Sequence, residues 1–122
     1  MVNTYFLKHR ATHIQDYLIT LHSGTWFEWI DSKNKIYSNL KLSDKVSVNG
    51  EVVDNPFSLP TEEECTDGLA QLQSDYDAKE YSRNRAKEYP SIGDQLDYIY
   101  HNGVTKWKTD MITPVKEKYP KP

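Results

Sequence analysis

The sequence has few of the features that identify a secreted protein or a membrane protein. Its 122 residues include a single cysteine, Cys65, so no disulfide can form within the chain. It opens without the charged and apolar regions of a signal peptide, and no apolar run approaches the ~20 residues that cross a bilayer. These absences predict a soluble protein that is made in a reducing cytoplasm, exported by no signal peptide and bound to no membrane.

Motifs that carry catalysis, phosphate binding or metal binding are also absent. The sequence has no Gly-rich phosphate loop, nucleophile elbow or His-Glu-x-x-His pattern. His9 and His13 have the spacing of two metal ligands on one helical face, but no carboxylate at helical spacing supports them. Cys65 lies among glutamates on an apolar seam, which indicates a buried packing residue. The sequence therefore predicts a non-enzymatic protein without a metal, a cofactor or a small-molecule substrate.

The charge balance argues against a nucleic-acid partner. The formal net charge is −3 and the pI is near 5.8, whereas a general nucleic-acid binder is basic. Acidic residues concentrate between residues 62 and 80, and lysines between residues 106 and 121. This asymmetry can support head-to-tail contact between subunits, but we prefer the simpler reading of two solvated faces.

Residues 1–59 predict a small antiparallel β region. Alternation at 17–22 and aromatic residues at 25–30 indicate two strands joined at Ser23-Gly24, and 36–42 indicates a third. Asn49-Gly50 between two valine-rich runs predicts a type I′ hairpin, which needs positive φ at both central residues. We expect an antiparallel β-meander of three or four strands, and hence an α+β fold once the helices are added.

Residues 60–122 predict a helical module. Thr61 and Glu64 form a capping box at the start of a long helix, 61–88, whose apolar seam is Cys65, Leu69, Leu72 and Tyr76. Tyr89-Pro90 ends this helix. Two short helices then form a hairpin, 91–102 and 105–118, with Ser91 as a cap, Ile92, Leu96 and Ile99 on one face, and Gly103 at the turn. Pro114 is expected to kink or end the last helix.

The chain is rich in aromatic residues, with nine tyrosines and three tryptophans. Trp26, Phe27 and Trp29 would occupy both faces of one strand, and a thin meander covers only one face. We therefore expect at least one of them to bind a partner protein, with Tyr17 or Tyr37 as cross-strand neighbours. The alternative is that a small sheet uses these rings to fill a thin core.

Basic residues precede the Tyr89-Pro90 break and acidic residues follow it. Arg83, Arg85 and Lys87 could bind phosphate groups beside the neighbouring tyrosines, and they could equally pair with acidic side chains. We prefer the second reading, in which they bind Asp94 or Asp97 and lock the two helices at a structural corner.

The last third of the chain carries the most specific pattern. Residues 83–97 contain Arg-x-x-x-Tyr-Pro-Ser-Ile-x-Asp-Gln-Leu-Asp, and residues 115–120 read Val-Lys-x-Lys-Tyr-Pro. From Tyr81 to Pro122 the chain resembles a module of small proteins of tailed bacteriophages, above all cyanophages, that belong to the tail region.

The resemblance implies a non-enzymatic virion protein that is synthesised in the host cytoplasm and assembled into the tail. It would be a tail, baseplate or fibre-attachment adaptor that contacts other virion proteins or copies of itself. Two alternatives remain open, a tail or tail-fibre assembly chaperone absent from the mature particle, and a host-takeover protein that binds a host enzyme.

Overall fold

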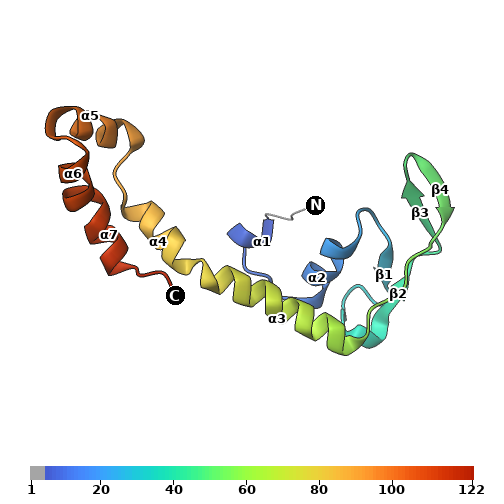
Figure 1. Cartoon of the computed structure of the whole chain (residues 1–122). Helices are drawn as coiled ribbons and strands as arrows, with labels where there is room; N and C mark the ends of the chain where they lie inside the picture. Colours follow the sequence, from blue (N-terminus) through green and yellow to red (C-terminus); the bar gives the residue numbers. More distant parts are fainter. Residues whose placement is uncertain (1–4) are drawn as a thin grey trace. The chain divides into compact units, whose positions relative to one another are not determined.

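A computed structural model describes residues 5–122, so the first four residues of the expected β region lie outside the described residues. The chain divides into two compact units, Met1–Ser74 and Asp75–Pro122. The expected α+β class is confirmed: strand pairs lie in the N-terminal half and helices follow them (Figure 1). The division does not coincide with the expected boundary between residues 59 and 60, because the long helix contributes its first turns to the core of the first unit.

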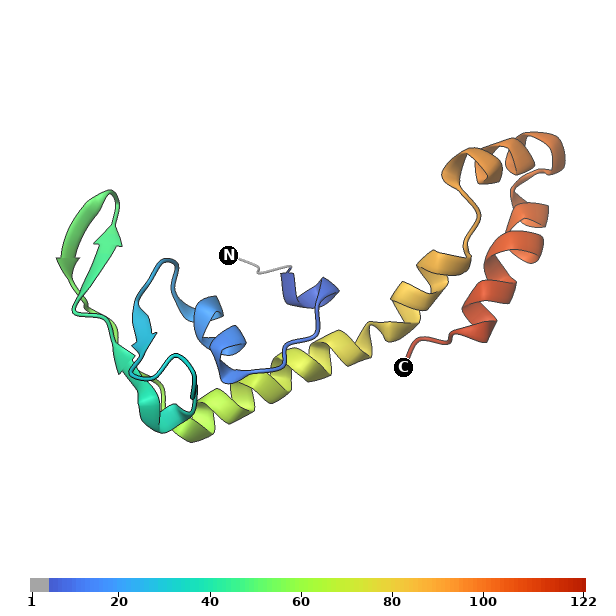
Figure 2. The ribbon, with the colours of Figure 1, turned by 180° about the vertical axis from the view of Figure 1, so that it is seen from behind.

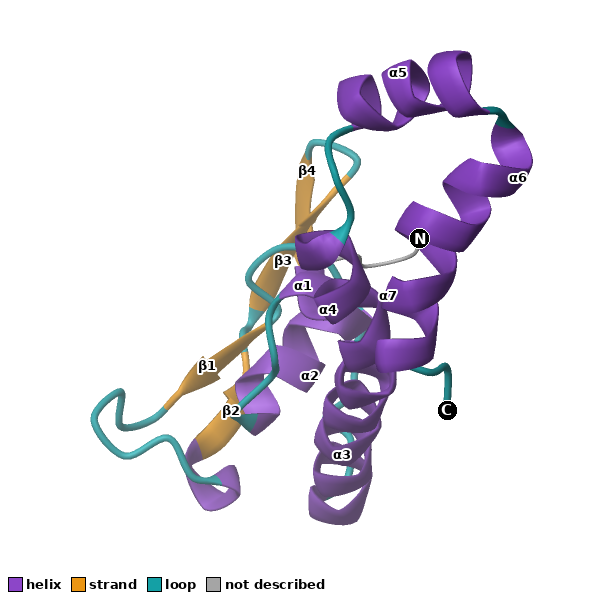
Figure 3. Ribbon diagram, turned by 90° about the vertical axis from the view of Figure 1, so that its left-hand side faces the viewer, coloured by secondary structure: helices purple, strands orange, loops and turns teal. Residues whose placement is uncertain are grey.

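The first unit combines helices with two separate pairs of strands. In chain order its elements are α1 (Tyr5–Lys8), α2 (Ile14–Leu21), β1 (Phe27–Trp29), the 3-10 turn η1 (Tyr37–Asn39), β2 (Leu40–Leu42), β3 (Lys45–Val48), β4 (Glu51–Asp54) and α3 (Glu62–Ala78). β1 pairs antiparallel with β2, with Phe27 opposite Leu42, and β3 pairs antiparallel with β4 (Figure 3). The expected continuous meander is therefore wrong, since β2 and β3 belong to different sheets.

The strand predicted at 17–22 is also wrong, because residues 17–21 belong to α2 and His22 is its C-cap. Nδ1 of His13 accepts a hydrogen bond from the Gln15 amide, and the Asp16 carboxylate accepts one from the His13 amide, which together cap the helix. Nε2 of His13 lies 2.8 Å from the Lys35 carbonyl oxygen. The alternating pattern favoured a strand, but the capped start and the burial of one helical side decide for a helix.

Several local predictions are confirmed. Asn49 and Gly50 have φ of 53° and 83°, and their turn sets Val48 opposite Glu51 in the β3–β4 hairpin. The hydroxyl of Thr61 accepts a hydrogen bond from the Glu64 amide at 3.1 Å, and the Glu64 carboxylate accepts one from the Thr61 amide. These features depend on neighbouring residues alone, which is why the sequence predicts them.

The core of the first unit is built around Trp26. Its buried members come from α2, the residue before β1, strands β2 and β3, and α3: Leu18, Trp26, Leu40, Val46 and Cys65. His22 stacks on Phe57 with ring centroids 3.7 Å apart, and both rings pack edge-on against the indole of Trp26. Cys65 is fully buried, as predicted, and burial, followed by the charges of Glu64 and Glu62, raises the pKa of its thiol.

Asn55 connects three segments of this unit with one side-chain amide. Its Nδ2 donates to the carbonyl oxygens of Trp26 and Ser43, at 2.8 and 2.7 Å. Its Oδ1 accepts from the Phe57 amide at 2.9 Å. The side chain thus joins the approach to β1, the end of β2 and the linker that leads to α3.

Gly68 allows the ring of Tyr17 on α2 to lie directly against α3. A Cβ atom at position 68 would lie 2.2 Å from Cδ1 and Cε1 of that ring, closer than real atoms approach. Glycine inside a helix costs about 0.5–1 kcal/mol relative to alanine. The contact with Tyr17 accounts for a glycine at this position.

The second unit is helical and begins with the last turn of α3. Its further elements are α4 (Glu80–Glu88), α5 (Ile92–Asn102), α6 (Val104–Trp107), the π-helical turn η2 (Lys108–Ile112) and α7 (Thr113–Lys118). Lys79 separates α3 from α4, so the expected helix 61–88 is interrupted once, whereas the helix predicted at 91–102 matches α5. Within this unit α7 returns alongside α4 (Figure 2).

The expected effect of Pro114 takes the form of a π-helical turn. Proline has no N–H, and its ring clashes with the carbonyl group four residues earlier, here that of Asp110. The chain widens to the π-helical turn η2, which ends two residues before Pro114, and continues as α7. The predicted helix 105–118 is therefore divided into three segments.

We predict that replacing Asn55 destabilises the first unit. Asn55→Asp retains an acceptor for the Phe57 amide and loses the donor that serves two carbonyl groups. The free energy of unfolding should fall by about 1–3 kcal/mol, measured by chemical denaturation. Asn55→Ala should cost at least as much, and an Asn55→Asp protein as stable as wild type would contradict this role.

The two glycines that lie inside helices should respond oppositely to alanine. Gly68→Ala should lower the free energy of unfolding by about 1–3 kcal/mol, because the Tyr17 ring must move. Gly93→Ala in α5 should raise it by about 0.5–1 kcal/mol, since a Cβ atom there meets nothing within 4 Å. Thermal melts of both variants test this contrast. Equal shifts of the two melting temperatures would refute it.

Candidate protein interaction surface

The predicted aromatic interface is not exposed. Trp26 is fully buried, so its assignment to a partner is wrong. Phe27 and Trp29 are half-buried and pack against the same core. The reason is that α2 replaces the expected strand and supplies Leu18, with Ile14 beside it, to cover rings that a thin meander would have left open.

Tyr17 and Tyr37 are likewise half-buried against this core. Tyr17 lies against Gly68, and the Tyr37 hydroxyl donates to the Pro60 carbonyl oxygen at 2.6 Å. Trp29 donates from Nε1 to the side chain of Gln15 on α2 at 2.9 Å. The five predicted partner-binding residues therefore come together, but as the packing of their own unit.

The predicted pairing of basic and acidic residues around Pro90 is also wrong. Nη1 of Arg83 donates to the Tyr76 carbonyl oxygen at 2.8 Å, and its guanidinium carbon lies 3.7 Å from the centre of the Tyr76 ring. The Tyr76 carbonyl lies at the break between α3 and α4, where it also accepts a hydrogen bond from the Lys79 amide at 3.1 Å. Arg83 therefore supplies a donor to a helix end.

Arg85 binds backbone carbonyl groups at the C-terminal end of α7. Its Nε donates to the Tyr119 carbonyl oxygen at 2.8 Å, and its Nη2 lies 3.4 Å from the carbonyl oxygen of Lys116 in α7. Its guanidinium group also lies over the Tyr81 ring, 4.9 Å from the centre. A helix C-terminus leaves carbonyl groups without partners inside the helix, and a guanidinium group has donors for two of them.

The remaining residues of the expected corner have local partners. Asp97 lies 3.4 Å from Nε2 of His101, one turn along α5. The backbone amide of Asp94 donates to the hydroxyl of Ser91, which caps α5 as predicted. Tyr89 and Pro90 do separate two helices, but the Pro90 carbonyl accepts a hydrogen bond from Gln95. Lys87 is exposed, and no ion pair of residues 5–122 joins it to either aspartate.

Glu88 binds two residues at the C-terminal end of α7. Its Oε1 accepts from Nζ of Lys118 and from the Tyr119 hydroxyl, each at 2.7 Å. Lys118, then Tyr119, hold the pKa of Glu88 below its ordinary value. The Glu88 carboxylate in turn raises the pKa of Lys118 and of Tyr119. Together with Arg85, these contacts hold residues 118–122 against α4.

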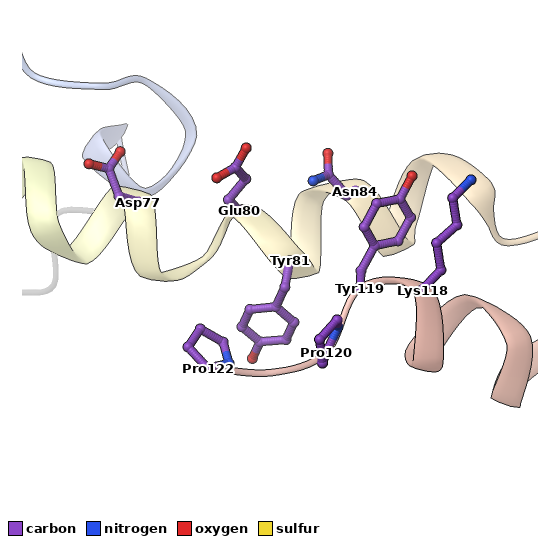
Figure 4. A pocket seen from close by; sticks show the side chains of 8 residues that line it. All are labelled: Asp77, Glu80, Tyr81, Asn84, Lys118, Tyr119, Pro120 and Pro122. Atoms are coloured by element: carbon purple, nitrogen blue, oxygen red, sulfur yellow. The ribbon is translucent and has the colours of Figure 1, made fainter.

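An open pocket of about 270 Å³ remains beside this docked segment (Figure 4). Its lining combines tyrosine and proline rings with acidic and amide groups: Asp77, Glu80, Tyr81, Asn84, Lys118, Tyr119, Pro120 and Pro122. Both tyrosine rings already have a cation of the chain close by, Arg85 for Tyr81 and Lys118 for Tyr119. We therefore interpret the pocket as the space left by docking of the C-terminal segment.

The largest cluster of exposed apolar side chains in the second unit lies on α5. Ile92, Leu96 and Tyr100 are 71%, 61% and 84% exposed, and Gly93 lies on the same side of the helix. We call these four residues the α5 face. Residues four apart lie on one side of a helix, so the three side chains form a continuous stripe.

The α5 face points away from its own unit because the opposite side of α5 is tied to the following helices. Gln95 accepts a hydrogen bond from Nε1 of Trp107 in α6 at 3.1 Å. The Tyr98 hydroxyl donates to Asp110 in η2, and that carboxylate raises the pKa of Tyr98. Ile99 is half-buried, whereas Ile92 and Leu96 are exposed. The three residues share one side of the helix, as the sequence predicts, and the unit covers only its Ile99 edge.

A comparison of the chain with protein-family models, with curated proteins and with solved structures gave no match. No helix among residues 5–122 is both long and apolar enough to cross a bilayer. Across the same residues, no three His, Cys, Asp or Glu side chains gather as metal ligands would. The α5 face is taken as the candidate site because Ile92, Leu96 and Tyr100 expose apolar surface side by side.

We predict that docking of residues 118–122 depends on pH at both extremes. The pKa of Glu88 is lowered, so the contribution of Glu88 to docking is present above the ordinary carboxyl pKa. This contribution is lost as pH falls through the folded-state pKa of Glu88. The pKa values of Lys118 and Tyr119 are raised. Their contribution to docking is therefore present below the ordinary pKa values of these groups, and it is lost as pH rises through the folded-state values.

Amide chemical shifts of Lys118 and Tyr119, followed by NMR from pH 7 downward, should move together with the Glu88 carboxyl signal. Glu88→Gln should remove this acid transition. Glu63→Gln, on the exposed first turn of α3, is the matched control and should leave it unchanged. An acid transition that persists in Glu88→Gln would contradict the role of Glu88.

Proposed function

We propose that the chain is a non-enzymatic adaptor of a bacteriophage tail, which acts by protein–protein contacts through the α5 face. The observation that carries the proposal is the exposed stripe of Ile92, Leu96 and Tyr100 on a helix whose other side is fixed by hydrogen bonds. Exposed apolar stripes of this kind mark interfaces, because covering them with another protein removes apolar surface from water.

The phage context comes from the sequence resemblance of residues 81–122, which includes all of α5. The segment with the most specific pattern is thus the segment that displays the apolar stripe. The partner is expected to be a virion protein of the tail, baseplate or fibre-attachment region, and it should offer an apolar surface that covers three side chains on about three turns of helix.

The proposal is tested in the phage that encodes the chain, by quantitative mass spectrometry of purified particles. We expect the chain in the particles, and we expect Leu96→Asp to reduce its incorporation at least tenfold, because a carboxylate in an apolar contact loses its hydration. Val52→Asp is the matched control, since Val52 is 75% exposed in the β3–β4 hairpin of the first unit.

Three other outcomes would overturn parts of the proposal. A chain absent from particles but bound to a tail protein in infected cells would be an assembly chaperone. A chain that copurifies only with a host enzyme would be a host-takeover protein. Equal incorporation of Leu96→Asp, Val52→Asp and wild-type chains would show that the α5 face has no part in assembly.

A further inference from the structure

We infer that the core of the first unit has a binding site for one buried water molecule, between Nε1 of Trp26 and Oγ of Ser43. Trp26 is fully buried and Ser43 is 8% exposed. Among residues 5–122, these two buried side-chain atoms have no hydrogen-bond partner in the protein. The site lies within the first unit, so it is independent of the α5 face and of the adaptor function.

The strand register makes Trp26 and Ser43 direct neighbours. β1 pairs antiparallel with β2, and Phe27 lies opposite Leu42. The next pair outward is therefore Trp26 and Ser43, and the Ser43 amide donates to the Trp26 carbonyl oxygen at 3.1 Å. Side chains of directly opposite residues lie on the same face of an antiparallel pair. The two atoms without partners thus belong to adjacent side chains on one face.

Glu28 and Lys41 show that opposite side chains on this face do meet. They form the next pair along the same face, and Nζ of Lys41 lies 3.0 Å from the Glu28 carboxylate. That pair is exposed to solvent. At Trp26, by contrast, the rings of His22 and Phe57 pack edge-on against the indole and help to bury it. A ligand of the indole N–H must therefore be small enough to lie inside the core.

The spacing of opposite residues suits a single bridging water. Their Cβ atoms are about 4.5–5.5 Å apart in an antiparallel pair. A direct hydrogen bond between the two side chains would need about 2.9 Å, and it is not formed. A water molecule joins polar atoms that are up to about 6 Å apart, because it spans two hydrogen bonds.

The chemistry of the two atoms selects a small neutral ligand. The indole N–H of Trp26 can only donate, whereas the hydroxyl of Ser43 can donate and accept. The ligand must therefore accept one hydrogen bond and exchange another with a hydroxyl group. A cation cannot accept from the indole, and an anion would lose its hydration among apolar side chains. Water meets both requirements, and buried water is found where it has two to four polar partners.

The backbone of this residue pair is already satisfied. The Trp26 carbonyl oxygen accepts from the Ser43 amide and from Nδ2 of Asn55, and the Ser43 carbonyl oxygen also accepts from Asn55. Only the two side-chain atoms remain to be paired. Most buried polar atoms in proteins have a partner, and two that face each other across a strand pair can share one. A bound water would remove the destabilisation of both at once.

A high-resolution crystal structure of the full chain tests the site directly. We expect a water oxygen at about 2.7–3.2 Å from both Nε1 of Trp26 and Oγ of Ser43. Two results would overturn the inference. One is a direct hydrogen bond between the two side chains. The other is a Ser43 hydroxyl that donates to a backbone carbonyl group, with no water beside the indole.

The indole N–H signals of the three tryptophans test the site in solution by NMR. We expect Hε1 of Trp26 to show cross-peaks to water with opposite signs in NOE and ROE spectra, as a water that tumbles with the protein gives. Trp29 and Trp107 are internal controls, because their indoles donate to Gln15 and Gln95 at 2.9 and 3.1 Å. The crystal structure distinguishes a bound water from a cross-peak relayed through the Ser43 hydroxyl.

Ser43→Ala removes one of the two partners of the water. We expect this variant to lose the water cross-peak of Trp26 and to shift its indole N–H signal, while the signals of Trp29 and Trp107 stay in place. Ser47→Ala, on an exposed position of β3, is the matched control and should change none of them. A Trp26 indole signal that is the same in Ser43→Ala and wild type would show that the two side chains share no ligand.

Discussion

Burial of the Trp26 indole is the interaction on which the first unit depends. Two pairs of short strands cannot form a core of their own, so α2, α3 and the linker must close around one large ring. Burying a ring of this size contributes about 4–6 kcal/mol. That exceeds the cost of about 1–3 kcal/mol for leaving its Nε1 atom without a hydrogen-bond partner among residues 5–122.

The second unit depends on a different constraint, the need to satisfy carbonyl groups where helices break or end. Arg83 reaches the Tyr76 carbonyl beside the interruption at Lys79, and Arg85 reaches two carbonyl groups at the end of α7. Both guanidinium groups also lie over tyrosine rings, which holds them in place. Because these donors are used on the backbone, the arginines do not pair with the aspartates of α5, and α5 is held instead through Gln95 and Tyr98.

This way of holding α5 explains why its apolar residues are exposed. Polar contacts on the inner side replace the apolar packing that the sequence pattern would suggest, and Ile92, Leu96 and Tyr100 are left facing outward. In the first unit, by contrast, the rings around Trp26 are occupied by their own core: Tyr17, Phe27, Trp29, Tyr37 and Phe57. The apolar side chains that remain exposed in the second unit therefore lie mainly on α5, where we propose the interaction surface.

The sequence by itself determined the features that depend on near neighbours: the Asn49-Gly50 hairpin, the caps at Thr61 and Ser91, the end of α5 at Gly103 and the mixed α+β class. The burial of Cys65 also followed from its place on an apolar seam. Only the tertiary structure decided that residues 14–21 form a helix, that Trp26 lies inside the core, that Arg83 and Arg85 bind carbonyl groups, and that Leu96 faces outward. Those outcomes depend on which distant segments are available to cover a ring or offer a donor, and the local pattern of residues carries no record of such distant partners.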